Sequence, residues 1–133
     1  MNKIIVEVSI GELLDKISIL EIKKEKIKDA EKLKFINNEH SILKNRLEKN
    51  IKSDEKLNNL YQSLKVINSK LWVIEDDKRQ CEKDKDFGEK FIKLSRDVHF
   101  LNDDRAKIKL EINNHTGSAI KEIKEYTLSL IHI

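Results

Sequence analysis

One polar and aromatic stripe carries the chemistry that stands out most in this sequence. Trp72, Glu75 and Arg79 are three and four residues apart and share one face of a predicted helix, with Asn68 before them and Glu82 after them. Glu75 and Arg79 have the i,i+4 spacing of a helical ion pair. The stripe is either an ion-pair ladder with Trp72 packed against another helix or a recognition face, because Trp and Arg dominate binding hot spots. We favour the first interpretation, since helical bundles seldom leave a Trp on the surface.

Arginine is rare in this chain, in which most basic residues are lysines. Each arginine is therefore a candidate for a specific binding role. Its planar fork binds carboxylate or phosphate better than a lysine does. Arg105 falls at a position where an apolar residue is expected. If buried, it must meet a carboxylate, and Glu75 or Asp76 is the predicted partner. A ligand-binding arginine is the alternative, and Arg96 and Asp103 on the same predicted helix complete the candidate binding residues.

Three carboxylate pairs have a spacing at which side chains converge on a helix: Glu12 and Asp15, Glu21 and Glu25, and Glu122 and Glu125. Glu12 and Asp15 are the pair taken as the candidate site. All-helical nucleotide pyrophosphohydrolases hold magnesium with such pairs. However, 24 of the 133 residues are acidic, so this spacing also arises by chance. The favoured interpretation is therefore solvated or lysine-paired carboxylates.

No metal site and no cofactor are predicted. The four His residues are isolated in the sequence, and the one Cys, Cys81, is expected to be a buried, inert thiol. No Ser, Thr or Cys lies in a recognisable nucleophile motif. The sequence therefore gives no direct evidence of catalysis.

Capping signals locate the elements that must position these side chains. Ser9 and Glu12 form a capping box. Gly117 is a typical C-terminal cap of the long helix before it. The signals predict four long helices and a short fifth one ending near Tyr126. They begin after Ser9, Asp29, Ser53 or Asp54, at the turn around Asp86-Phe87-Gly88, and after Ser118.

Two heptad seams indicate how the helices pack. The third helix alternates apolar residues three and four apart from Leu57 to Cys81, and the fourth does so from Phe87 to Ile112. A tight turn between them predicts an antiparallel hairpin. The first helix has the widest apolar face and is expected to be the most buried. We predict an all-α fold, an elongated antiparallel bundle of about four long helices.

The two ends of the chain alternate apolar and polar residues, as short strands do. These segments are 4–8 and 127–133. Both are apolar, so we predict that they pair with each other.

Composition supports one helical domain spanning residues 1–133. Charged residues make up 38% of the chain, with three Gly and no Pro, which excludes turn-rich barrels and sandwiches. Acidic and basic residues are interleaved at a net charge of +3, so nucleic acid is not an expected partner. No signal peptide and no apolar window of about 18 residues is present, so no membrane association is expected and the predicted location is cytoplasmic.

Three segments resemble an uncharacterised bacterial and phage family of small helical proteins, a domain of unknown function. They are VEVSIGELLDK at 6–16, LWVIEDDKR at 71–79 and NDDRAKIK at 102–109. The resemblance implies a single helical domain and no particular activity. The recognisable stretches contain Glu12, Asp15, Trp72, Glu75, Arg79, Asp103 and Arg105.

Together these features favour a non-enzymatic interaction or scaffold protein. We expect it to form a homo-oligomer, a dimer, through its heptad seams, since one short chain does not cover long seams. An unidentified protein partner is the other partner class left open. The alternative function is an all-helical enzyme on an anionic substrate, either a magnesium-dependent nucleotide pyrophosphohydrolase or a mutase-like bundle.

Overall fold

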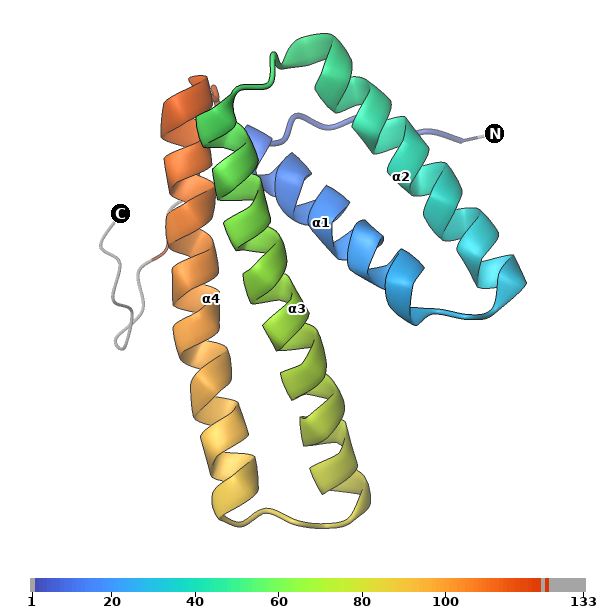
Figure 1. Cartoon of the computed structure of the whole chain (residues 1–133), viewed down its shortest axis with the longest axis vertical. Coiled ribbons are helices and arrows are strands. Elements are labelled where there is room, and N and C mark those ends of the chain that lie inside the picture. Colours follow the sequence, from blue (N-terminus) through green and yellow to red (C-terminus); the bar gives the residue numbers. More distant parts are fainter. Residues whose placement is uncertain (1, 123, 125–133) are drawn as a thin grey trace.

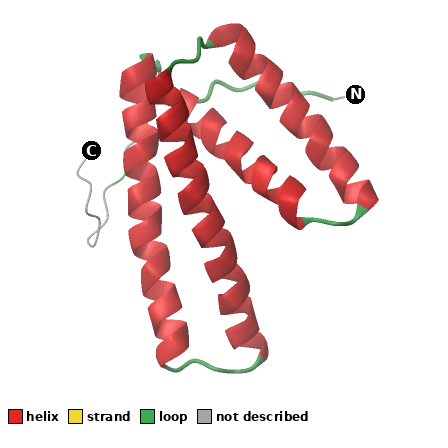
Figure 2. Cartoon of the chain, viewed as in Figure 1, coloured by secondary structure: helices red, strands yellow, loops and turns green. Residues whose placement is uncertain are grey.

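The computed structural model describes residues 2–122 and 124, and these form four helices and no strand (Figures 1 and 2). The helices are α1 (Ile10–Lys26), α2 (Ala30–Asn50), α3 (Glu55–Lys83) and α4 (Glu89–Thr116). The predicted all-α fold is confirmed. Within the described part of the chain, no helix is both long enough and apolar enough to cross a membrane.

The predicted caps account for the helix ends. Ser9 Oγ accepts from the Glu12 amide at 3.0 Å, and Asp29 caps α2 in the same way. Of the two residues proposed to cap α3, Asp54 does so, through a 2.7 Å bond from the Leu57 amide. Gly117 adopts the left-handed conformation at the end of α4, with φ 68°. Each cap satisfies backbone groups that the helix itself leaves free.

The helices form two antiparallel pairs that diverge from one end (Figure 1). α3 and α4 make the long hairpin, and α1 packs against both of them near the end that carries the α2–α3 connection. The backbone of α2 approaches only α1. The two pairs share a small apolar core of Leu14, Leu57, Leu64 and Ile112. α1 is therefore the helix that joins α2 to the hairpin.

Burial follows the predicted pattern in α1 and at five positions of the α3 seam, whereas Ile112 is the one position of the predicted α4 seam that is buried. Seven of the 17 residues of α1 are buried, against six of the 29 residues of α3, so α1 is the more buried helix. The α3 seam points inward at Leu57, Leu64, Ile67, Leu71 and Cys81. These seam positions are covered within the chain, and a second copy would have to bind elsewhere.

Residues 118–122 and 124 do not form the predicted short fifth helix, and the rest of that prediction lies outside the described residues. The reason is the hydroxyl of Ser118. Instead of capping a helix of its own, it accepts from the Ile10 amide at the start of α1, at 3.1 Å, and donates to the Ile120 carbonyl at 2.9 Å. The segment after α4 is thereby tied to the start of α1.

Residues 4–8 are extended but form no strand. Their apolar side chains are largely open to solvent, with Ile4 91% and Ile5 84% exposed. A strand needs a partner for its backbone groups, and none of the described residues supplies one. The predicted partner, 127–133, lies outside the described residues.

Candidate functional site

The site begins where the backbones of α1 and α4 almost touch, at Gly11. A Cβ added there would lie 2.7 Å from the carbonyl oxygen of Lys109. The Gly11 amide donates to Asn113 Oδ1 at 2.7 Å, and the Asn113 side chain is fully buried. Only a residue without a side chain allows this approach. The contact fixes the register of α1 against α4, and this register determines which polar residues of the two helices meet.

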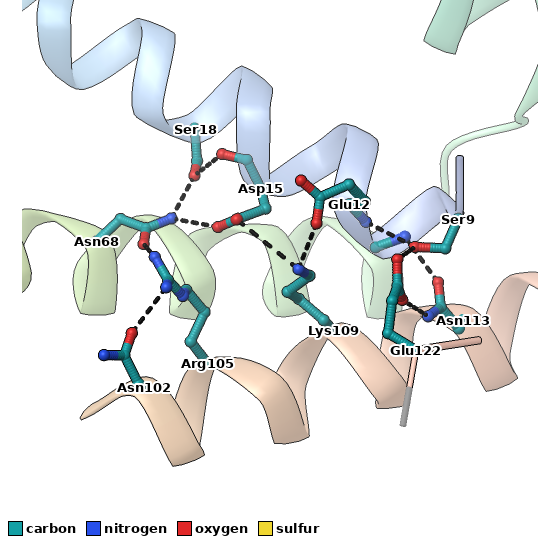
Figure 3. Close-up of polar contacts among 11 residues, drawn as sticks. Ser9, Glu12, Asp15, Ser18, Asn68, Asn102, Arg105, Lys109, Asn113 and Glu122 are labelled. Carbon is teal, nitrogen blue, oxygen red and sulfur yellow. Dashed lines mark hydrogen bonds and ion pairs between the residues drawn. The ribbon is translucent and has the colours of Figure 1, made fainter. Parts of the chain in front are cut away.

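Glu12 and Asp15 project from α1 onto one cation of α4 (Figure 3). Lys109 Nζ lies 2.5 Å from Glu12 Oε2 and 3.9 Å from Asp15 Oδ2. The two carboxylates that sequence reasoning paired are thus brought together, with a lysine as their shared partner. Among the described residues, no group of three or more His, Cys, Asp or Glu side chains is arranged to hold a metal ion.

A buried amide, Asn68 of α3, links Asp15 to Arg105 (Figure 3). Its Nδ2 donates to Asp15 Oδ1 at 2.8 Å and to Ser18 Oγ at 2.7 Å, and its Oδ1 accepts from Arg105 Nη1 at 3.2 Å. Arg105 Nη2 donates to Asn102 Oδ1 at 2.7 Å. Three helices therefore contribute to one connected network, in which each buried polar group has a partner.

The predicted ion pair between Arg105 and Glu75 or Asp76 is not formed. Among the described residues, both hydrogen-bond acceptors of Arg105 are neutral side-chain amides, on Asn68 and Asn102. The physical reason is the register of α3 against α4, which places Asn68, itself hydrogen-bonded to Asp15 and Ser18 of α1, rather than an acid of α3 beside the guanidinium. Glu75 and Asp76 instead line the same groove as Arg105.

That groove, which we call the Arg105 groove, has a volume of about 330 Å³. Four candidate residues of the sequence analysis line it together. Its lining residues are Ile19, Ile22, Asn68, Leu71, Trp72, Glu75, Asp76, Arg79 and Arg105. Trp72 is half-buried beside the α1 residues, so it is neither a core residue nor fully exposed. Within the described part of the chain, Glu75 and Arg79 form no ion pair, so the predicted ladder is absent there.

Asp103 and Arg96 lie apart from this groove. Asp103 is buried and forms an ion pair with Lys124 of the C-terminal segment. Arg96 lines a separate groove of about 390 Å³ on α4, together with Asp97 and Phe100. The six candidate binding residues thus divide between three places, and only the Arg105 groove collects several of them.

The C-terminal segment adds Glu122, which the sequence analysis placed only in a possible pair with Glu125 and whose contact with the start of α1 it missed. Its carboxylate accepts from Ser9 Oγ at 2.6 Å and from Asn113 Nδ2 at 3.3 Å. Burial favours the neutral form, but the bond from Ser9 and the charge of Lys109 outweigh it and hold the pKa of Glu122 below its usual value. The charged carboxylate thus ties the end of the described chain to the start of α1.

Gly11 and Asn113 were also missed, although the sequence contained a signal for one of them. Glycine is scarce here, with three in 133 residues, and Gly11 lies inside a predicted helix where it costs stability. Such a glycine indicates close backbone approach. Nothing in the sequence marked Asn113, because its role depends on which residue of α1 lies opposite it.

Comparisons with known proteins are consistent with this structure. The family model described as "Family of unknown function (DUF6165)" matches residues 4–132. No curated protein and no solved structure matches the chain. The match spans nearly the whole chain and includes all three segments on which the earlier resemblance depends. The chain therefore belongs to the family of unknown function DUF6165.

Proposed function

We propose that this protein is a helical interaction protein that self-associates through one face of the α3–α4 hairpin. We define this outer face by four exposed apolar residues, Val66 and Val73 of α3 and Ile92 and Phe100 of α4. The observation that carries the proposal is their exposure, between 44% and 55% for each residue. Apolar side chains gathered on one surface mark an interaction site more often than isolated ones do.

The shape of the outer face suits a second pair of helices. A groove of about 630 Å³ runs between α3 and α4, with Val73 and Phe100 on its walls and Ile74 and Leu101 also lining it. α1 and α2 contribute no residue to this groove. Two antiparallel helices with an apolar groove form half of a four-helix bundle, and a second copy supplies the other half. The interface uses Val73 and Phe100 beside the heptad seams together with the seam residues Ile74 and Leu101, because five other positions of the α3 seam are already buried within the chain.

The charges around the outer face favour another copy of this chain as the partner. Lys70 and Asp97 line the apolar groove, and Asp97 forms an i,i+4 ion pair with Lys93 at 2.9 Å. The adjoining groove adds Glu89 and Arg96. In a two-fold symmetric dimer the same patch meets itself, so a patch of mixed charge complements its own copy.

We propose no enzymatic function from the carboxylate pair. The charges of Glu12 and Asp15 are directed at Lys109, and Asp15 also accepts from Asn68. A magnesium site would need these oxygens free to bind the ion.

The proposal is tested by the oligomeric state of paired variants. Multi-angle light scattering over a range of concentrations is expected to show a native species near twice the 15.7 kDa chain mass. Val73→Glu places a charge at the centre of the outer face and is expected to leave a monomer. Ile42→Glu is the matched control, because Ile42 of α2 is 51% exposed against 50% for Val73 and lies off the outer face.

Two results would contradict self-association through this face. One is a native mass that stays at 15.7 kDa at every concentration. The other is a dimer that Val73→Glu leaves intact or that Ile42→Glu dissociates equally well. Circular dichroism of each variant checks that the helical content is unchanged.

A further inference from the structure

We propose that the Arg105 groove is a binding site for a small amphipathic carboxylate, a molecule with one carboxylate and an apolar or aromatic body. The site lies between α1, α3 and α4, and none of the four residues that define the outer face lines it. It is therefore independent of the proposed self-association. The inference rests on the geometry of Arg105, on the charge balance of the lining and on the apolar wall.

Arg105 is held in place without being neutralised by a direct contact. Its Nη1 and Nη2 groups each donate to a neutral amide, on Asn68 and on Asn102. A guanidinium has five N–H donors, and among the described residues only these two donors have protein acceptors. The nearest acid in the network, Asp15, reaches Arg105 only through Asn68 and is also paired with Lys109. The free edge of the fork is thus positioned to bind a carboxylate in the groove.

The charges that line the groove select a ligand of single negative charge. Arg79 and Arg105 contribute two positive charges, and Glu75 and Asp76 contribute two negative ones. A lining with no net charge does not attract a dianionic phosphate strongly, because the two acids repel it. A monocarboxylate needs only one guanidinium. The balance therefore favours a carboxylate over a phosphate.

The remaining lining favours an apolar body on the ligand. Ile22 and Leu71 are buried at 1% and 8% exposure, and Trp72 lies half-buried beside them in the same groove. An indole offers a flat surface against which an aromatic or aliphatic group packs. A volume of about 330 Å³ lies at the small end of the usual range for ligand pockets. The groove therefore suits a small molecule.

Trp72 also makes the proposal directly measurable. It is the single Trp of the chain, so tryptophan emission, excited at wavelengths that the two Tyr residues do not absorb, reports on this groove alone. We would titrate the full-length protein with 3-phenylpropionate, with its neutral amide and with inorganic phosphate, at constant ionic strength. The expected result is a saturable change in Trp72 emission with the carboxylate, binding at least tenfold weaker for the amide, and no change with phosphate.

Matched arginine variants assign the effect to the proposed residue. Arg105→Gln removes the charge and the fork, and we expect it to weaken 3-phenylpropionate binding at least tenfold. Arg96→Gln is the control, because Arg96 is on the same helix but lines a different groove. Arg105→Lys keeps the charge without the planar fork. Its affinity for 3-phenylpropionate is expected to lie between the affinities of Arg105→Gln and Arg96→Gln.

Several outcomes would overturn the proposal. These are equal binding of acid and amide, an equal response to inorganic phosphate, no saturable change with 3-phenylpropionate, or equal weakening by Arg105→Gln and Arg96→Gln. If Arg105→Gln does not fold, the contrast between acid and amide on the native protein still decides the question.

Discussion

The two faces of the α3–α4 hairpin are formed by the same two helices, but one buries polar side chains and the other exposes apolar ones. The face against α1 buries polar side chains, Asn68 and Asn113 among them, and each has partners within the chain. The outer face leaves apolar residues such as Val73 and Phe100 in solvent. A folded chain is usually arranged the other way round.

The difference shows which face of the hairpin is satisfied by contacts within the chain and which face is not. Buried polar groups are tolerated only when every one of them is hydrogen-bonded, so the α1 face needs an exact register between three helices. Exposed apolar groups carry no such constraint, and they become favourable when another surface covers them. The α1 face therefore determines the internal fold, and the outer face is free for a partner.

The largest expected effect comes from separating α1 from α4. Gly11→Ala places a Cβ 2.7 Å from the Lys109 carbonyl oxygen, so the backbones must move apart. We expect a loss of about 3 kcal/mol of unfolding free energy, measured by urea denaturation. Gly88→Ala is the control, because its added Cβ meets only Asp86 Oδ1, at 3.5 Å. Equal effects of the two substitutions would show that the α1–α4 contact is not closely packed.

A smaller effect is expected from Asn68→Ala. This change removes a donor from the buried Asp15 carboxylate and the acceptor for Arg105 Nη1. A buried group left without its partner costs about 2 kcal/mol. Asn59→Ala on the exposed side of the same helix is expected to change the unfolding free energy by less than about 0.5 kcal/mol. A tolerated Asn68→Ala would mean that water replaces the amide and that the network does not set the register.

The smallest effect is expected at Glu122, and it depends on pH. The pKa of Glu122 is lower in the fold than the usual Glu value of about 4.3. The charged carboxylate therefore stabilises the fold at pH values above this usual pKa. The stabilisation is lost as the pH falls through the lowered pKa of the folded state. Glu122→Gln should reduce the unfolding free energy at pH 7 by less than about 1 kcal/mol, because Glu122 is exposed and solvent screens it.

The stability difference between the native protein and Glu122→Gln should shrink from pH 7 to pH 3, because the carboxylate binds its proton as the pH falls. Urea denaturation at both pH values provides the measurement. A difference that persists unchanged at pH 3 would mean that the carboxylate charge is not what ties the C-terminal segment to α1.

Part of the candidate site was predictable from the sequence, and part was not. Helical spacing placed Trp72, Glu75 and Arg79 on one face, and all three line the Arg105 groove. The same spacing suggested that Glu75 would pair with Arg79, but spacing does not reveal which other groups compete for a charge. The partner of Arg105 was predicted to be an acid because α3 carries two acids nearby. The prediction failed because Asn68, about two turns before these acids, is the residue that faces α4 at that height.

The sequence by itself determined the four helices, their caps and the inward seam of α3, because these depend on hydrogen bonds and periodicities within a few residues of each other. Only the tertiary structure decided that the backbone of α2 approaches α1 alone, that Ser118 caps α1, and that Asn68 lies between Asp15 and Arg105. Each of these contacts joins residues far apart in the chain. Their existence depends on the register and angle at which whole helices meet, and at Gly11 that register is set by a backbone contact of α1 with Lys109 that allows no side chain.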